Sequence, residues 1–278
     1  MTIRIVTDSA CDLPDALAKK LNITIVPLTY RFGEEEFVDR ESLTTQQFWA
    51  KCAQSPVLPE TAAPSPGKFE AAFRDLAAQG ATGICVVSLS SDLSATMQSA
   101  EVAAKSFAGQ IPIRIVDSRS ASMGEGITVL ACAELAATGA TLDQVADFGT
   151  AFVKRVQCWA ALDTLENLKK GGRIGGVKAL MASALSIKPI LEIANGLIAA
   201  GGKQRTRGKA VAFLVDKVRN AGEIDHLVIL QAECADSDVL LSGLREFYHG
   251  EIPIADIGAV IGSHAGPGAI GVAFSTVN

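Results

Sequence analysis

Residues 83–88 read GICVVS, a short apolar run that is followed by a hydroxyl-rich loop, residues 88–96, and then by a helical pattern over residues 95–107. The same alternation of apolar runs and amphipathic stretches fills the first half of the chain. Such a rhythm is typical of a parallel β-sheet that is covered by helices on both faces. The first half is therefore predicted to be an α/β domain.

The expected elements of this half are short, and two of the helices have recognisable starts. Thr44 is a candidate N-cap, and Ser65 precedes a proline at the first helical position. We expect strands at residues 3–7, 23–30, 83–88 and 113–117, and helices near residues 14–21, 45–53, 67–78, 95–107 and 122–138.

The pattern changes near residue 150, where we expect a domain boundary. Asn195-Gly196 separates two strand candidates, and this dipeptide favours a two-residue hairpin because both central residues of the turn need positive φ. The expected elements of this half are strands at residues 158–162, 187–193, 197–204, 226–232, 253–260 and 270–276, and helices near residues 142–155, 209–221 and 237–248. The sequence thus predicts an N-terminal parallel-sheet α/β domain over residues 1–150 and a smaller C-terminal α/β domain with a mixed or antiparallel sheet over residues 151–278.

Composition limits the class of protein. The chain has 278 residues, of which 49% are hydrophobic and 20% charged, as expected of a globular protein. It contains neither an apolar run of about 18 residues nor a recognisable signal peptide, so we expect a cytoplasmic protein without stable membrane insertion. The six cysteines are scattered without short paired spacing, which favours buried thiols over disulfides or a zinc site.

Charge is unevenly distributed along the chain. The net charge of −5 argues against general binding of nucleic acid, which requires a basic surface. Residues 166–219 nevertheless contain 11 Lys or Arg against 3 Asp or Glu, a local balance of +8. This region could attract an acidic partner or a phosphorylated ligand, or could be an ordinary solvated surface.

One of the three histidines lies in a loop of small residues. Residues 261–269 read IGSHAGPGA, so glycines on both sides of His264 allow backbone and ligand to approach closely. The imidazole on such a turn could bind a ligand or transfer a proton, and it could equally hydrogen-bond the backbone.

Two further loops are rich in hydroxyl groups. Thr61 lies in residues 59–66, and Ser94 lies in residues 88–96, close to the start of a helix where backbone amides favour an anion. Thr61, Ser94 and His264 together could hold a carboxylate, although Thr61 and Ser94 taken singly are better explained as turn or cap residues. Because none of the three loops contains Lys or Arg, we expect a head group held by neutral hydroxyls and one imidazole.

Other chemistries have less support in the sequence. There is no Gly-x-Ser-x-Gly nucleophile elbow and no glycine-rich nucleotide-binding motif. Asp8, Asp12 and Asp117 lie at the ends of predicted strands, but their spacing forms no metal-ligand set, and a capping role is favoured.

Taken together, these segments resemble the DegV family of bacterial fatty-acid-binding proteins over nearly the whole chain. The resemblance rests on the order and spacing of several motifs, namely residues 5–14 (IVTDSACDLP), 25–28, 37–39, 61–69, 90–100, 163–174 and 262–268 (GSHAGPG). It implies a two-domain protein that encloses a long-chain fatty acid between its domains, with no catalytic residue, metal or cofactor of its own.

The resemblance also implies the site residues and a partner. The expected ligand-binding residues are Thr61, Ala62, Ser94, Ala95, Gly266 and His264, with Thr61, Ser94 and His264 at the carboxylate. Family members with an assigned role present the acid to a separate fatty acid kinase, which converts it to an acyl phosphate. From the charge pattern, we expect Arg173, Arg205 and Arg207 to form the docking face.

Three positions depart from the family pattern, and two alternatives stay open. Ala62 stands where the family has serine, Ala95 where it has glycine, and Met97 where it has tyrosine. The alternatives to a carrier are a serine-dependent acyl-handling enzyme, with Ser94 as nucleophile and His264 as base, and a regulatory adaptor with a bound lipid.

Overall fold

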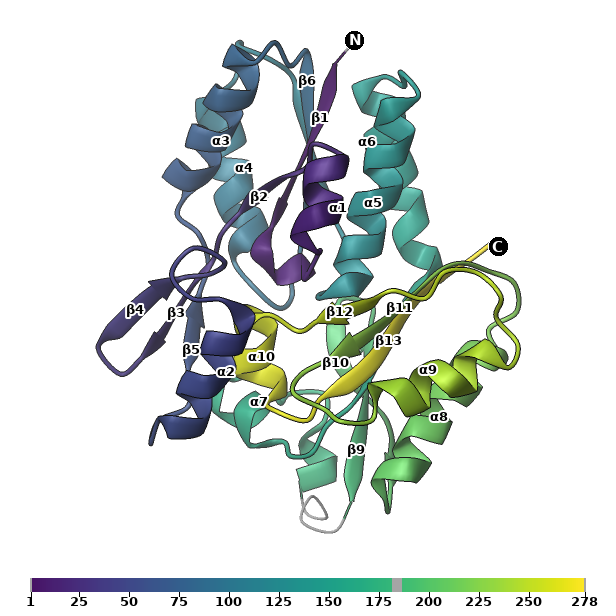
Figure 1. Ribbon diagram of the computed structural model, residues 1–278. Helices are drawn as coiled ribbons and strands as arrows, with labels where there is room; N and C mark the ends of the chain where they lie inside the picture. The colour runs from purple at the N-terminus through teal and green to yellow at the C-terminus, as the bar shows by residue number, and fades with distance from the viewer. Residues whose placement is uncertain (1, 182–186, 278) are drawn as a thin grey trace.

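The computed structural model describes residues 2–181 and 187–277. In Figure 1 the first half of the chain forms the upper and left parts of the molecule, and most of the second half forms the lower right part. Three β-sheets organise these residues, and ten α-helices surround or separate the sheets. The predicted α/β class is confirmed.

The first sheet is parallel, as predicted. Its order is β2-β1-β6-β7, formed by β1 (Ile3–Asp8), β2 (Thr24–Val26), β6 (Gly83–Ser88) and β7 (Ile113–Asp117). Helices α3 (Pro66–Ala78) and α4 (Thr96–Ser106) cover one face, and α5 (Met123–Ala137) and α6 (Leu142–Phe152) cover the other. Because both faces are covered, β6 is buried along its whole length, which explains its continuous apolar run.

The second sheet is mixed and has six strands. Its order is β10-β9-β8-β13-β11-β12, formed by β8 (Val156–Ala161), β9 (Lys188–Ala194), β10 (Leu197–Gln204), β11 (Ile224–Gln231), β12 (Ile254–Asp256) and β13 (Ile270–Thr276). Only β11 and β12 pair in parallel. The predicted hairpin is confirmed, since β9 and β10 pair antiparallel on either side of Asn195 and Gly196, both of which have positive φ. Helices α8 (Arg207–Arg219) and α9 (Ser237–Arg245) pack on this sheet.

A small third sheet was not predicted. It has the order β4-β3-β5 and comprises β3 (Thr29–Phe32), β4 (Glu35–Val38) and β5 (Glu60–Ala62). The prediction of one strand over residues 23–30 is wrong, because the segment divides into β2 and β3, which belong to different sheets. The break lies at Pro27, which has no N–H to donate to a continuing ladder.

The third sheet is stabilised by aromatic packing against α2 (Thr45–Gln54). Tyr30 stacks on Phe37 with ring centroids 5.4 Å apart and meets Phe48 of α2 edge-on at 5.3 Å. Thr44 caps α2, as predicted, because its hydroxyl accepts a hydrogen bond from the Gln47 N–H at 3.2 Å. Helix α1 (Asp15–Lys20) precedes β2.

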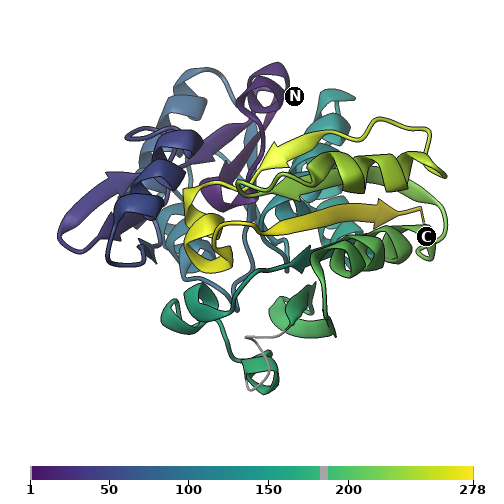
Figure 2. The same ribbon diagram turned by 60° about the horizontal axis from the view of Figure 1, so that its bottom comes forward.

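The C-terminal loop region contains a helix that the sequence did not indicate. The predicted strand over residues 253–260 ends at Asp256, and α10 (Ala259–Ala265) follows it. His264 therefore lies in the last turn of a helix and not on a free loop, and the helix ends at Gly266, which has φ 76°. A second unpredicted helix, α7 (Glu166–Lys170), contacts α10, which also contacts α2 (Figure 2).

Helix α5 joins the two large sheets. It packs on β1 and β6 of the parallel sheet and on β8 and β13 of the mixed sheet. The hydrophobic core is continuous across this helix, with Ile5 and Val87 on one side and Val228 and Ala273 on the other. The division at residue 150 stays a prediction, although the strands on either side of it form separate sheets. None of the helices in the described ranges has the length and apolar character needed to cross a bilayer.

Buried carboxyl groups lie where α5 meets the parallel sheet. Glu125 is fully buried and accepts a hydrogen bond from Thr7 Oγ1 at 2.9 Å. Burial raises the pKa of Glu125 well above its usual value, so the protonated carboxyl donates to Asp8, whose own pKa burial raises to about 6. Asp8 also caps the short 3-10 turn Ser9–Cys11, which agrees with its predicted capping role.

These carboxyls make stability depend on pH. A carboxyl whose pKa is raised by folding holds a proton that the unfolded chain releases, so its contribution is present below the unfolded pKa and is lost as pH rises through the folded pKa. We therefore expect the free energy of unfolding to fall between pH 5 and pH 8. Chemical denaturation across this range measures it.

Glu125→Gln isolates one carboxyl, because the amide can accept from Thr7 and donate to Asp8 as the protonated acid does. This variant should reduce the pH slope by up to about 1.4 kcal/mol per pH unit. The matched control is Glu134→Gln, on the exposed side of the same helix. Equal slopes in the Glu125→Gln variant and the unaltered protein would contradict the assignment.

Candidate functional site

A largely apolar cavity lies between the two large sheets. The space between its lining atoms is about 900 Å³ and includes the part that opens to solvent. Strands β8, β9, β10 and β11 line one side, and the loops that follow β2, β6 and β7, together with β5 and α10, line the other. The apolar lining residues are Leu28, Leu89, Leu93, Ala121, Ala160, Leu162, Leu168, Leu191, Ile193, Ile198, Leu230, Ile257, Val260, Ile261 and Ala265.

The three residues predicted to bind a carboxylate, Thr61, Ser94 and His264, all line this cavity. Thr61 comes from the edge strand β5, and its Oγ1 lies 2.9 Å from Nε2 of His264 in α10. The two residues are 203 positions apart in the chain. The fold therefore brings together the polar groups that the separate loops only suggested.

His264 is neutral in this setting. Burial, and next the positive charge of Arg173, lower its pKa to about 4. No group in the described residues pairs with Nδ1, so we assign the proton of the neutral ring to Nε2, which donates to Thr61 Oγ1. The Thr61 hydroxyl is then free to donate its own hydrogen to an acceptor in the cavity.

The position of the imidazole depends on close packing against α7 and its C-terminal end. A Cβ at Gly171 would overlap Nδ1 of His264, so only glycine leaves room for the ring. Asn167 is buried and donates from Nδ2 to the Ser263 carbonyl at 3.1 Å. Gly266 contacts the same asparagine, because a Cβ there would lie 2.9 Å from its Oδ1. These contacts fix the end of α10 that carries His264.

Ser94 approaches the cavity just before α4. Its Oγ accepts a hydrogen bond from the Thr96 N–H at 3.3 Å and lies 2.9 Å from Thr96 Oγ1. Helix α4 begins at Thr96, so Ser94 is near the helix start, as predicted. When the Thr96 hydroxyl donates to Ser94, the Ser94 hydroxyl can donate into the cavity.

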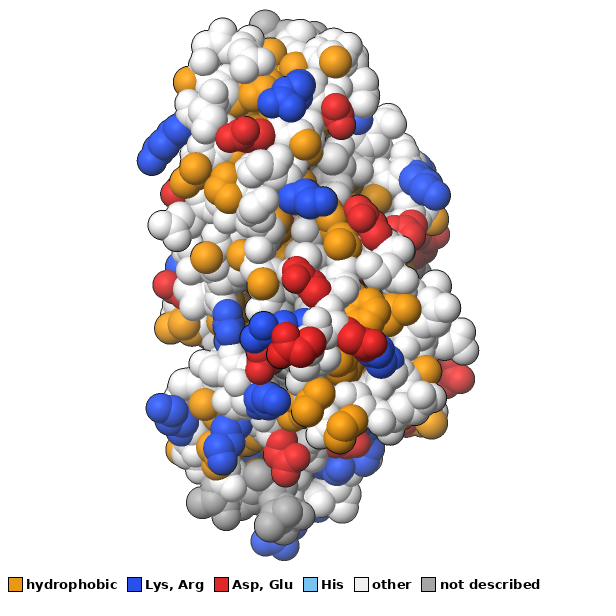
Figure 3. Space-filling view, turned by 90° about the vertical axis from the view of Figure 1, so that its left-hand side faces the viewer, with side chains coloured by type: hydrophobic (Ala, Val, Ile, Leu, Met, Phe, Trp, Pro, Cys, Tyr) orange, Lys and Arg blue, Asp and Glu red, His pale blue; other side chains and the backbone are white. Residues whose placement is uncertain are grey.

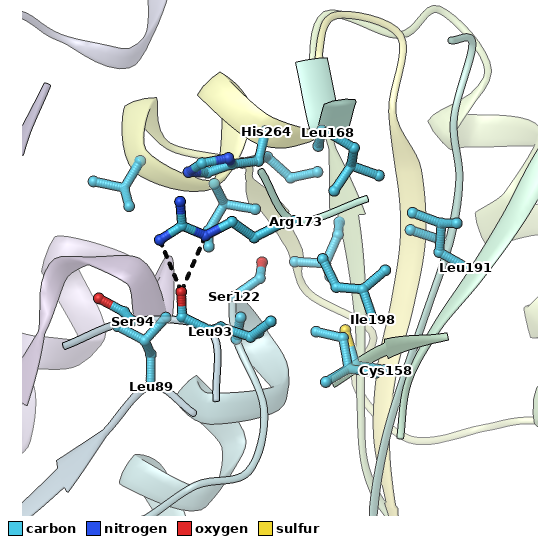
Figure 4. Close-up of a pocket in the computed structure, with 18 of the residues that line it drawn as sticks. Leu89, Leu93, Ser94, Ser122, Cys158, Leu168, Arg173, Leu191, Ile198 and His264 are labelled. Carbon is cyan, nitrogen blue, oxygen red and sulfur yellow. Dashed lines mark hydrogen bonds between the residues drawn. The ribbon is translucent and has the colours of Figure 1, made fainter. Parts of the chain in front are cut away.

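Arg173, which lies outside the three predicted loops, also lines the cavity. A head group held by neutral hydroxyls and one imidazole stays a prediction. The Nε and one terminal nitrogen of Arg173 donate to the Leu93 carbonyl at 3.1 and 3.0 Å, and the other donates to the Gly171 carbonyl at 2.6 Å (Figure 4). The guanidinium thus lies beside His264 and Ser94. The sequence predicted Arg173 on a docking face because of its place in the basic region. No local pattern links the segment after α7 to the three loops.

Other predicted ligand contacts lie outside the lining. Ala62, Ala95 and Gly266 do not line the cavity, and the first two are exposed. Ala62 lines a small hollow beside β3, and Ala95 and Met97 line an open groove on the outer surface. Gly266 lies against Asn167. Direct contacts of these three residues with a ligand stay a prediction.

The two other arginines predicted for docking differ from each other. Arg207 is tied down, because its guanidinium makes two hydrogen bonds to Asp236, at 2.6 and 2.8 Å, and one to the Gly268 carbonyl at 2.6 Å. Arg205 is exposed at the end of the β10–α8 connection. Among the described residues, no hydrogen bond or ion pair holds the side chain of Arg205.

Comparison with known proteins identifies the family. The model of the DegV family, described as uncharacterised proteins, matches residues 2–277. A DegV domain-containing protein of Streptomyces coelicolor is 35% identical over 280 residues, which cover 99% of this chain and 98% of the relative. The structure of a DegV family protein from Thermus thermophilus, described by its fatty acid binding, superposes with a TM-score of 0.90 at 32% identity and covers 100% of both chains.

A further solved structure carries a named lipid. The DegV family protein from Ruminococcus gnavus, described with vaccenic acid, is 26% identical, covers 98% of this chain and 99% of its own, and has a TM-score of 0.88. The matches agree on one fold over the whole length. The chain therefore belongs to the DegV family.

Proposed function

We propose that this protein binds one long-chain fatty acid non-covalently, with the carboxylate at Thr61, Ser94 and His264 and the acyl chain between the two large sheets. The observation that carries the proposal is the combination of a long apolar lining with hydroxyl donors gathered at one end. The fatty-acid-binding relatives with the same fold support it.

The head-group residues suit a carboxylate, which only accepts hydrogen bonds when ionised. His264 donates from Nε2 to Thr61, and this orients the Thr61 hydroxyl hydrogen toward the ligand. Ser94 supplies a second hydroxyl, and bonds to an ionised acceptor are stronger than neutral ones. His264 is therefore a positioning residue for Thr61 in this scheme.

The acyl chain supplies most of the affinity. Each buried methylene contributes about 0.8 kcal/mol, so a sixteen-carbon chain gains on the order of 10 kcal/mol before the costs of association. The head group then needs few interactions. Arg173 supplies a positive potential beside it, while its own donors are occupied by the Leu93 and Gly171 carbonyls.

The protein is proposed to present the bound acid to a fatty acid kinase. The open groove at the start of α4 shares Leu93, Ser94 and Arg173 with the cavity, so the head-group end lies next to the outer surface. Lys and Arg side chains gather toward the lower end of the face drawn in Figure 3. A basic face near an accessible head group suits a partner that carries phosphate. The six free thiols are consistent with a proposed location in the reducing cytoplasm.

The enzyme alternative has a geometric difficulty. A nucleophilic serine requires a general base within hydrogen-bond reach, but Nε2 of His264 bonds Thr61, and Ser94 bonds Thr96. No observation favours turnover over simple binding, so the proposal is a carrier without catalysis of its own.

The first test is native mass spectrometry of the purified protein, followed by organic extraction and analysis of the lipid. One fatty acid per chain is the expected result. Thr61→Val and Ser94→Ala should each weaken binding by roughly tenfold or more, because each removes a hydrogen bond to a charged acceptor.

The matched control is Ser91→Ala, which removes a neighbouring hydroxyl that donates to Asp117 at 2.6 Å and does not line the cavity. An empty protein that also fails to bind added fatty acids would overturn the proposal.

The protonation of His264 gives a second test. With a pKa near 4, its imidazole should stay neutral from pH 5 to pH 8. The ring carbon-bound proton signals in NMR should therefore not shift in this range, with the assignment made by their loss in His264→Gln. A titration midpoint above pH 5.5 would contradict the neutral, proton-donating role.

A third test concerns the partner. Arg205→Ala should lower the rate of acyl phosphate formation by a bacterial fatty acid kinase and ATP, by about threefold or more, and leave fatty acid affinity unchanged. The control is Lys19→Ala, an exposed cation of α1 outside the basic region. Equal loss in both variants would show that Arg205 has no specific role.

A further inference from the structure

Two polar side chains line the cavity outside the head-group cluster. Ser122 and Cys158 belong to the lining, and Figure 4 draws the Ser122 hydroxyl and the Cys158 sulfur among apolar side chains such as Ile198. Neither is part of the Thr61–His264 hydrogen bond or the Ser94–Thr96 contact. The apolar part of the cavity therefore contains a polar position that binding a plain hydrocarbon chain does not require.

Ser122 occupies this position at a conformational cost. Its φ of 52° and ψ of −147° fall in a region that suits glycine, and such a backbone costs on the order of 1–3 kcal/mol for other residues. Its side chain donates to Asp12 Oδ2 at 2.5 Å, and Asp12 itself has a φ of 51°. A strained serine is kept where glycine would fit more easily, and strained residues are enriched at ligand contacts.

The donors and acceptors of this pair match a hydroxyl group. The Ser122 hydroxyl gives its hydrogen to Asp12 Oδ2, so its oxygen offers only acceptor capacity to the cavity. The Cys158 sulfur accepts from the Gly124 N–H, which leaves the thiol hydrogen as a weak donor. A hydroxyl on a bound chain could donate to Ser122 and accept from Cys158.

We infer that the cavity is built to take an acyl chain that carries a hydroxyl group at the level of Ser122 and Cys158. This inference rests on the proposed fatty-acid-binding function and names the class of chain. A hydroxyl elsewhere on the chain would be buried against leucine and isoleucine side chains without a partner, which is unfavourable. The pocket therefore discriminates between acyl chains according to the position of their hydroxyl group.

The test compares stearate with a series of monohydroxystearates whose hydroxyl lies on successive chain carbons. Affinities are measured by competition with a fluorescent fatty acid bound to the full-length protein. One position, or two adjacent ones, should bind roughly 2- to 10-fold more tightly than the rest of the series, as expected for one neutral hydrogen bond.

Ser122→Gly is the decisive variant, because glycine adopts the observed backbone without strain and lacks the hydroxyl. It should remove the peak from the series, so that no position of the hydroxyl group binds more tightly than the others. Cys158→Ala should lower the same peak. The matched control, Ile198→Val, changes the lining without changing hydrogen bonding and should keep the peak.

Each outcome decides the matter. A flat series in a protein that binds stearate, or a peak that survives in Ser122→Gly, would overturn this inference and leave the proposed function standing. Failure of stearate and of every hydroxystearate to bind would overturn both.

Discussion

Burial of helix α5 against both large sheets is the constraint on which the rest of the structure depends. Its first turns allow no side chain at two positions, since a Cβ at Gly126 would lie 2.8 Å from the Cys11 carbonyl and one at Gly124 would lie 3.0 Å from Cys158 Cβ. These close approaches bring β8 and the turn after β1 against the start of α5. The cavity lies in the seam between the two large sheets, beside α5. Its position therefore follows from backbone packing and not from the residues that line it.

The seam is kept almost free of net charge by the same burial. His264 is neutral because burial disfavours the imidazolium, and Glu125 is protonated because burial disfavours the carboxylate. Arg173 is the exception, and its guanidinium is compensated by the Leu93 and Gly171 carbonyls, with no carboxylate partner among the described residues. A positive charge that is solvated by carbonyls keeps its attraction for an anion, which an ion pair would have cancelled.

Local patterns predicted the regular elements well, and long-range contacts account for the failures. Residues 83–88 and 270–276 form strands with the expected bounds because their apolar runs reflect burial on both faces. Residues 113–117 also form the expected strand, although Arg114 is exposed. The division at Pro27, by contrast, depends on two sheets competing for one segment. The helical placement of His264 depends on Asn167 and Gly171, and the approach of Arg173 to the cavity depends on the Leu93 carbonyl, 80 residues away. Of these features, only Gly171 and Gly172, the paired glycines before Arg173, are recognisable in the local sequence.

The head-group residues come from four separate parts of the chain, and this distribution has an energetic consequence for the proposed complex. Thr61 lies on β5, Ser94 precedes α4, Arg173 follows α7, and His264 ends α10. An anion that contacts these groups together would bridge elements packed on different sheets, so its binding would be coupled to their relative positions. The acyl chain makes non-directional contacts and is far less sensitive to such shifts. The acyl chain would then supply most of the affinity, while binding of the carboxylate would depend most strongly on the relative positions of these elements.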